Sequence, residues 1–481
     1  MEGCPTVDSP ATPRRRLALV LKLRDLAGFS VSGVGPLFSV AAVGGLFAAK
    51  AGGWTELSLA LVAVPFGVAA VVLRFLNQRF PNAGASYHWV RRILGERASR
   101  LQACVLVAAY FLSLPAIAVP AAGYTLALVA PHHQFSNLAN LAVGIAWLGL
   151  AWLALLAGAK PVAHVTKVFL AIEGLSLGGI VVLALARFST LHAAAVHGPV
   201  HRGGILFPLA GIVATAVMAA PILDGWEVDS YAAEESHKPR RDPGIGGMVG
   251  LAVSVLVYAV VFPLLFAEVP GGLLDGSGNP MTEWGARLIP GAPWLALVPV
   301  VTSAAGVLLL ISYILSRSLF SMGRDRMLPV AFSSTSGRQV PHLAVATGIG
   351  GAMAVMVVET TVQSLGTFFA VLLSATGFFL VAEFLLDSVA AAVLLRGEGA
   401  HRGLRWCAYL SATLLTALLV GFLVVAPSNI APGVDIVCGC VSGVAVAFAA
   451  WPRSRAGSLV HSFVPETDLV ETVEMEKVLV H

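Results

Sequence analysis

Charged residues are scarce in this sequence of 481 residues. They make up 12% of the chain, against about 25% in soluble domains, whereas hydrophobic residues make up 57%. A water-soluble fold could not bury that much apolar surface. The net charge is only +4, and the basic residues do not gather into a domain of their own. The composition therefore excludes an ordinary soluble protein and gives no support to nucleic-acid binding.

Cysteines and catalytic motifs are also few. None of the five cysteines stands at metal-ligand spacing across a loop, so we predict no metal site; they are Cys4, Cys104, Cys407, Cys438 and Cys440. Neither a His-Glu-x-x-His zinc motif nor a Gly-x-Ser-x-Gly elbow occurs. The spacing from His237 to Asp242 matches that of some acyltransferases, but it lies in a basic loop. We therefore expect no catalytic residues and no cofactor, and a membrane-embedded enzyme or a channel remains only as an alternative.

The chain is instead rich in long apolar blocks. Crossing a bilayer takes roughly 20 apolar residues, and twelve blocks of about that length alternate with short polar breaks. They run from Leu26 to Ala49, Leu57 to Leu73, Leu101 to Ala130, Leu138 to Leu156, Val165 to Leu185, Ile205 to Tyr231, Gly247 to Phe266, Pro293 to Leu315, Leu343 to Val358, Thr367 to Leu395, Trp406 to Val425 and Val434 to Ala450. They predict an all-α polytopic membrane protein with twelve transmembrane helices.

The basic residues support this count. Cytoplasmic loops collect Lys and Arg close to helix ends. With the N-terminus inside, the outer segments hold only Lys50, Arg187, Arg202 and Arg287, and the other 26 of the 30 basic residues lie inside. We predict a cytoplasmic tail over residues 1–25, a transporter domain over 26–452 and a cytoplasmic tail over 453–481. The lack of a targeting extension favours the plasma membrane.

The first and sixth blocks, which are five helices apart, both contain residues that interrupt helices. Proline removes an amide donor and glycine tolerates unusual dihedral angles. Irregular backbone inside a membrane is tolerated where it lines a cavity, so we predict a substrate site at both breaks, although a simple kink is the alternative at each. The residues are Ser32, Gly33, Val34, Gly35, Ile222, Leu223, Asp224 and Gly225.

At these residues the chain resembles the amino acid, polyamine and organocation transporter superfamily, which shares the leucine-transporter fold. The likeness covers nearly the whole chain and rests on four segments: Gly33 to Gly35, Phe80 to Tyr87, Asp224 to Arg241, and Ser316 to Pro329. It implies two inverted repeats of five helices, with helices 1 and 6 broken, plus two peripheral helices. It also implies a carrier of amino acids or related amines.

Some residues depart from the family pattern. Many members place a small hydroxyl residue between the helix 1 glycines, where it helps to hold a substrate carboxylate, but this chain has Val34. Pro36 removes a further amide, and Pro221 and Leu223 stand where relatives often have an aromatic gate. Zwitterionic amino acids, cationic amino acids, polyamines and choline-type amines all remain open as substrates.

Carboxylates inside apolar blocks are functional candidates, because burying their charge is costly. Asp224 can attract an ammonium group or cap a half-helix. Glu173 can load a proton or make a packing hydrogen bond. Glu383 and Asp387 share one face of a helix, where they can share a proton or lie hydrated beside arginines at the cytoplasmic end.

We therefore predict a secondary transporter working by alternating access, with H+ favoured over Na+ as the coupling ion. Its expected partners are a small-molecule substrate and the lipid bilayer, and the sequence leaves the oligomeric state open. Glu234 and Glu235 are expected at the cytoplasmic surface.

Overall fold

The computed structural model describes residues 17–134, 136–196, 209–274, 279–362, 364–397, 401–425 and 431–451. Most of residues 1–25 and all of residues 453–481, the two predicted tails, lie outside these ranges. The described residues form helices and no strand, apart from one isolated bridge between Leu21 and Ser236. The predicted all-helical class is confirmed.

Ten described segments are long and apolar enough to cross a membrane. Their helices are α1 (Leu23–Val34) with α2 (Pro36–Lys50), α3 (Thr55–Arg79), α5 (Glu96–Val129), α6 (Asn137–Leu156), α7 (Ala159–Val196), α10 (Ile245–Glu268), α13 (Trp294–Arg324), α14 (His342–Val357), α15 (Leu365–Arg396) and α16 (Arg402–Val425). Two shorter apolar helices, α8 (Leu209–Ala219) and α17 (Val434–Ala450), fall where the sixth and twelfth crossings were predicted. A multi-pass membrane protein is confirmed, whereas the count of twelve remains a prediction.

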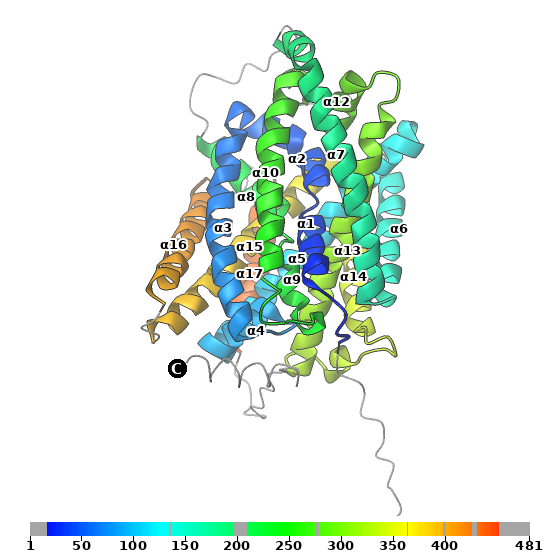
Figure 1. Ribbon diagram of the computed structural model, residues 1–481. Coiled ribbons are helices and arrows are strands. Elements are labelled where there is room, and N and C mark those ends of the chain that lie inside the picture. The colour runs from blue at the N-terminus through cyan, green and yellow to red at the C-terminus, as the bar shows by residue number, and fades with distance from the viewer. Residues whose placement is uncertain are drawn as a thin grey trace, which may run out of the picture.

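Short helices connect the long ones along the chain. Figure 1 shows α4 (Ala85–Leu94) at its lower end and α12 (Pro280–Leu288) at its upper end. The others are η1 (Gly52–Trp54), η2 (Pro131–His133), η3 (Pro221–Leu223), α9 (Val228–Tyr231), η4 (Ala233–Glu235), α11 (Gly271–Leu274), η5 (Val330–Ser333) and η6 (Val358–Thr361).

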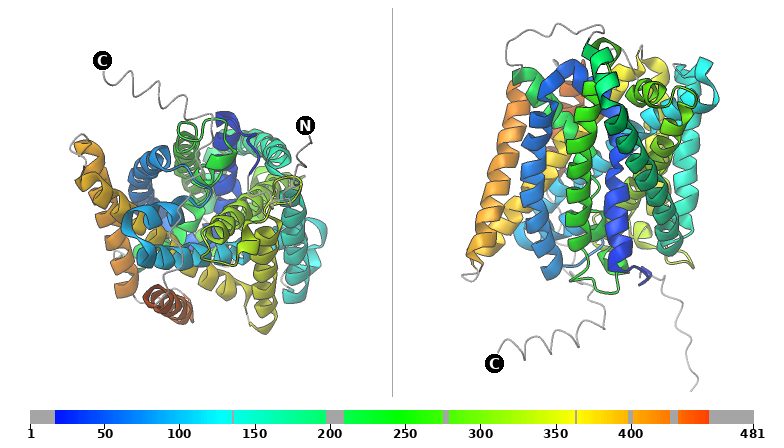
Figure 2. Two further views of the ribbon diagram at one scale, coloured as in Figure 1. Left: turned by 90° about the horizontal axis from the view of Figure 1, so that it is seen from below. Right: turned by 45° about the horizontal axis from the view of Figure 1, so that its top comes forward.

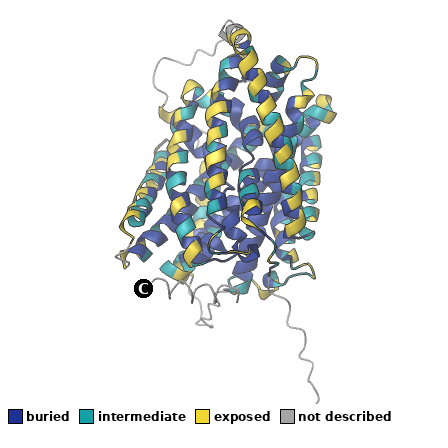
Figure 3. Ribbon diagram, viewed as in Figure 1, coloured by how far each residue is buried: buried dark blue, intermediate teal, exposed yellow. Residues whose placement is uncertain are grey.

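The helices form a bundle around a few central members. The strongest packing joins α5 to α15 and α13, α1 to α10, and α15 to α16. Helices α6 and α16 lie on opposite flanks, as Figure 2 shows from below and from an inclined direction. Exposed residues follow the outward faces of the peripheral helices (Figure 3), and these include large apolar side chains such as Leu175 and Ile436. Such an apolar exterior fits contact with lipid rather than water.

Both ends of the described chain lie on one face, which we call the inner face. The backbone amides of Val20 and Leu21, just before α1, each donate to the carbonyl oxygen of Glu235 at 2.9 Å. The amide of His237 returns a bond to Leu21 at 3.0 Å. At the other end of the chain, Arg100 donates to the carbonyl of Trp451. The bonds of Val20, Leu21 and His237 join the start of the first span (helix 1, made of α1 and α2) to the end of the sixth predicted span (helix 6, made of α8, η3 and α9).

Candidate functional site

The first span is interrupted at Gly35. Helix α1 ends at Val34, Gly35 takes the left-handed conformation with φ +53°, and α2 begins at Pro36. Glycine adopts that conformation without strain, and proline at a first helical position loses no helical hydrogen bond. The Ser39 hydroxyl donates to the carbonyl of Val34 at 2.9 Å, so a carbonyl released by the break has a partner inside the protein.

A second interruption follows α8. The chain passes through η3, turns at Gly225 with φ +92°, and resumes as the short helix α9. The side chain of Glu227 accepts the Gly225 amide at 3.1 Å, and the Tyr258 hydroxyl donates to the carbonyl of Ile222. Glu227 therefore partners an amide released by the break, but its side chain makes no capping bond to α9.

The two breaks meet at Gly33 and Gly225, and a small cavity lies beside them. Its volume of about 30 Å³ suits a water molecule or two, so an amino acid can enter only after the surrounding helices separate. The polar side chains lining it are Ser39, Ser113, Asp224 and Thr376. The remaining wall is apolar and includes Phe38 and Phe369.

Two polar atoms of the cavity wall are left without partners. Asp224 is 2% exposed, and neither its Oδ1 nor the Oγ1 of Thr376 has a hydrogen-bond partner among the described residues. Buried polar groups are normally hydrogen-bonded, and an exception asks for an explanation such as a ligand. These two atoms are suited to an ammonium group and a further polar atom of a substrate.

Sequence reasoning found only part of this wall. Of the eight predicted residues, Ile222 and Asp224 line the cavity, whereas Leu223 faces a groove on the other side of helix 6. Ser32 packs instead against Gly306 of α13. Ser113 and Thr376 were missed because single hydroxyl residues are ordinary in apolar helices, where they can bond their own backbone, as Ser113 does with Ala109 at 2.9 Å.

Glu173 belongs to α7, and its side chain lies at the start of α2. Its Oε1 accepts the backbone amide of Leu37 at 3.0 Å and the hydroxyl of Ser303 at 2.9 Å. A carboxylate is favoured at this position because helix N-termini carry partial positive charge and free amides. The structure thus shows the packing hydrogen bond that was one alternative for Glu173. Its carboxylate also occupies this half-helix terminus, which is therefore not free to hold a substrate carboxylate.

Glu383 and Asp387 are both fully buried on α15. The Tyr231 hydroxyl donates to Glu383 at 2.8 Å, and the Ser86 hydroxyl donates to Asp387. The alternative that both carboxylates are hydrated and paired with arginines is therefore wrong. Helix α4 and helix α9 cover this part of α15 and exclude water from it.

Hydroxyl and carboxyl groups connect this pair to the cavity. The Tyr110 hydroxyl lies 2.9 Å from Glu227 and 3.5 Å from Glu383. The side chains of Glu227 and Asp224 lie within hydrogen-bonding reach of each other. Four buried carboxyl groups therefore form a connected series from the cavity towards α4.

Glu234 and Glu235 are buried, at 3% and 1% exposure, so their predicted place at the surface is wrong. Glu234 accepts two hydrogen bonds from Arg324, at 2.6 and 2.8 Å, and Arg317 donates to Glu235 at 2.8 Å. Arginines of α13 neutralise both carboxylates, which allows them to be buried. These pairs join the segment after α9 to α13.

Comparison with known proteins fits this arrangement. The family model described as amino acid permease matches residues 21–442, which include both breaks and the cavity. The chain belongs to this family of amino acid permeases. This membership, and transporter relatives, argue against the enzyme reading of His237 and Asp242.

Relatives of this permease include named transporters. The branched-chain amino acid permease BcaP of Bacillus subtilis is 24% identical, over 61% of this chain and 65% of its own length. BcaP of Lactococcus lactis is 22% identical, over 67% and 72%. The L-methionine/branched-chain amino acid exporter YjeH of Escherichia coli is 28% identical, over 43% and 46%. The chain thus spans less than two thirds of the length of the first and last of these.

Proposed function

We propose that this permease is a secondary active transporter that carries a neutral amino acid by alternating access. The observation that supports this proposal best is the buried Asp224 carboxylate. One of its oxygens has no partner among the described residues, and the side chain lines a mostly apolar cavity between two broken helices. One carboxylate can balance one ammonium group, and an apolar wall suits an uncharged side chain. The names of the BcaP and YjeH relatives refer to branched-chain amino acids and methionine, which fit such a wall.

Binding of the ammonium group by Asp224 can be tested in proteoliposomes. We expect counterflow of leucine, isoleucine, valine or methionine in the wild type, and at least a ten-fold loss of it in Asp224→Asn. Glu359→Gln is the matched control, because Glu359 is a fully buried carboxyl group that does not line the cavity. Normal leucine affinity in Asp224→Asn would contradict the site. Counterflow of choline or a polyamine, without that of leucine, would favour the amine alternative.

Coupling to protons is the second part of the proposal. Glu383 and Asp387 stand four residues apart, both without exposure to solvent. Two carboxylates this close cannot both ionise cheaply, so we place a transported proton on this pair. The series through Tyr110, Glu227 and Asp224 supports communication between that proton and the substrate. Glu173 is a weaker candidate, because its Oε1 already serves the α2 terminus.

Glu383→Gln and Asp387→Asn distinguish coupling from binding. Each should abolish accumulation driven by a pH gradient while leaving substrate counterflow within about three-fold of the wild type. Glu268→Gln, which changes a buried carboxyl group at the far end of α10, should keep both activities. Accumulation that follows a sodium gradient at constant pH would refute proton coupling without affecting the proposed substrate site.

The predicted membrane arrangement belongs to the same proposal. We place both termini on the cytoplasmic side of a plasma membrane and assign α8 with α9, and α17, to the sixth and twelfth crossings. The matched breaks in the first and sixth spans support two inverted repeats. In this scheme the closed inner face opens while the outer side closes over the substrate.

A further inference from the structure

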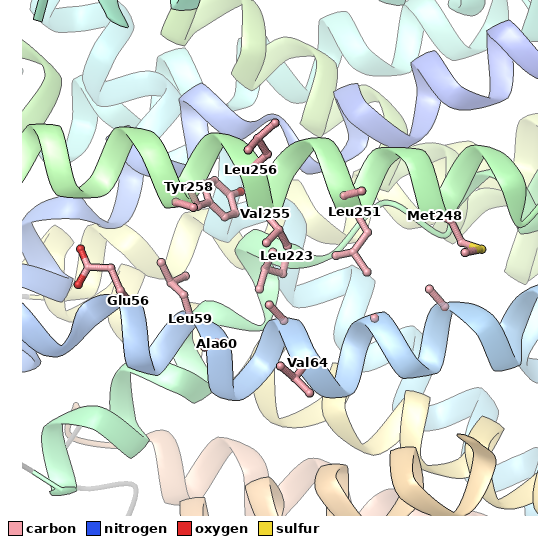
Figure 4. Close-up of a pocket in the computed structure, with 15 residues that line it drawn as sticks. Glu56, Leu59, Ala60, Val64, Leu223, Met248, Leu251, Val255, Leu256 and Tyr258 are labelled. Atoms are coloured by element: carbon pink, nitrogen blue, oxygen red, sulfur yellow. The ribbon is translucent and has the colours of Figure 1, made fainter. Parts of the chain in front are cut away.

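A second and larger cavity lies between α3 and α10, away from the candidate substrate site. Its volume is about 750 Å³. Figure 4 shows its side chains lying between the two helices, with Glu56 near one end, Met248 near the other and Leu223 between these ends. Glu56 and Tyr258 are the only lining residues with oxygen in their side chains. We call this cavity the α3–α10 groove.

The groove faces the surface that contacts lipid. Val64 and Leu256 at its rim are 57% and 66% exposed, and Ala63 and Gly67 leave room between the helices. From Glu56 to Ala70 it extends about 21 Å at 1.5 Å per helical residue. Half of a bilayer's hydrocarbon core is about 15 Å, so the groove is long enough for a lipid chain from one leaflet.

The two ends of the groove differ in charge. Glu56 lies at the outer end. One turn beyond Ala70, at the inner end, the Arg74 guanidinium lies 3.9 Å from the Met248 sulfur, which is only a weak acceptor. An anionic group at the inner end would be attracted by Arg74, whereas one at the outer end would be repelled by Glu56.

The loop after helix 6 adds to this basic end. Asn77 of α3 donates to the carbonyl of Pro239 at 3.0 Å, which holds the loop against the inner end of α3. The two residues that follow are Arg240 and Arg241. Basic clusters beside membrane helices bind anionic headgroups, with about 1 kcal/mol from each Lys or Arg near the surface.

We propose that the α3–α10 groove binds one anionic phospholipid from the inner leaflet, with an acyl chain along the groove and the phosphate beside Arg74. The acyl chain contacts Leu223 and Tyr258, which line the groove. Because Tyr258 also donates to the carbonyl of Ile222, the lipid supports the wall behind the helix 6 break. Occupancy of the groove therefore stabilises the closed arrangement of that break.

Lipid retention provides a test that does not depend on the transported substrate. Full-length protein is incubated in detergent with equal amounts of phosphatidylglycerol and phosphatidylcholine, re-isolated by gel filtration and extracted for mass spectrometry. We expect the wild type to retain phosphatidylglycerol preferentially. Ala63→Trp, which fills the groove, should reduce retention at least five-fold, whereas Leu61→Trp, on the exposed face of α3 outside the groove, should not.

The headgroup contact has its own comparison. Arg74→Gln should lower the preference for phosphatidylglycerol about five-fold, the equivalent of about 1 kcal/mol. Arg396→Gln, which changes an exposed arginine beside Tyr409, should leave the preference unchanged. Gly67→Leu is a milder filling variant that serves if Ala63→Trp fails to fold. Equal retention in the filled variants, or equal retention of the two lipids by the wild type, would overturn the proposal.

Discussion

The backbones of Gly33 and Gly225 are in direct contact. A Cβ atom added to Gly33 would lie 2.5 Å from the Gly225 carbonyl oxygen, and one added to Gly225 would lie 2.5 Å from the Gly33 carbonyl oxygen. Neither neighbour is the end of a flexible side chain, so the clash can be relieved only by moving a broken helix. The contact between the two breaks therefore requires glycine at both positions.

Gly33→Ala and Gly225→Ala should each reduce substrate affinity by at least ten-fold, because the breaks must separate to admit a methyl group. Gly225→Ala should have the larger effect, since its φ of +92° is also unfavourable for alanine. Scintillation proximity binding measures the affinity. Gly178→Ala is the control, as its added Cβ meets nothing within 4 Å. Wild-type affinity in both break variants would refute the importance of this contact.

Glu173 gives a prediction that separates its structural role from proton coupling. Glu173→Gln keeps an oxygen that can accept the Leu37 amide, so we expect thermal stability close to that of the wild type. Glu173→Leu leaves that buried amide without an acceptor and should cost about 1–3 kcal/mol. Differential scanning fluorimetry compares the two variants. If Glu173→Gln also keeps uphill, pH-driven uptake, Glu173 is not the coupling residue.

The buried pair of Arg317 and Glu235 should be sensitive to removal of one partner. Both side chains are 1% exposed, and Arg317→Met leaves the Glu235 charge uncompensated, at a cost of about 3–5 kcal/mol. Urea unfolding should show this loss, and adding Glu235→Gln should recover part of it. Glu96→Gln changes a carboxylate that is 58% exposed and should have little effect. Equal stability of Arg317→Met and the wild type would contradict the assigned role.

His88 on α4 should make the protein sensitive to acid. Burial, and the charges of Arg324, Arg92 and Arg91, lower the pKa of His88 to about 3, against about 6.5 when unfolded. The unfolded chain therefore binds more protons below pH 6.5. The stabilising contribution is present above that pH and is lost as the pH falls from 6.5 towards 3.

Replacing His88 should flatten this dependence. We expect the unfolding free energy of His88→Gln to fall less steeply between pH 6.5 and 5, by up to about 1.4 kcal/mol per pH unit. Urea unfolding at several pH values measures the slope. The exposed His164→Gln should behave as the wild type. Parallel slopes for His88→Gln and the wild type would show that His88 does not control the acid response.

The positions of the spans and breaks were largely predictable from sequence, because their signals are local. An apolar block predicts its own helix, and a Gly-x-Gly-Pro run predicts an interruption of its own backbone. The interruption at Gly35 follows from the run Gly33 to Pro36, and the one at Gly225 from Pro221 to Gly225.

Contacts between distant residues were much less predictable. Glu173 meets a backbone amide 136 residues away, and Asp387 meets a hydroxyl 301 residues away. The burial of Glu234 was missed for the same reason, since its partner Arg324 lies 90 residues further along the chain. Hydropathy near a span end indicates exposure, and only the folded chain shows which arginine neutralises the carboxylate.

The hydrogen bonds from Val20, Leu21 and His237 at the inner face have a mechanical consequence. They connect the segment before α1 to the segment after α9. The inner halves of the two broken helices are therefore mechanically coupled. An opening motion that displaced only one half would have to break all three bonds. In the proposed alternating access, the least costly motion therefore moves both halves together, and a force applied to the segment before α1 is transmitted directly to the segment after α9.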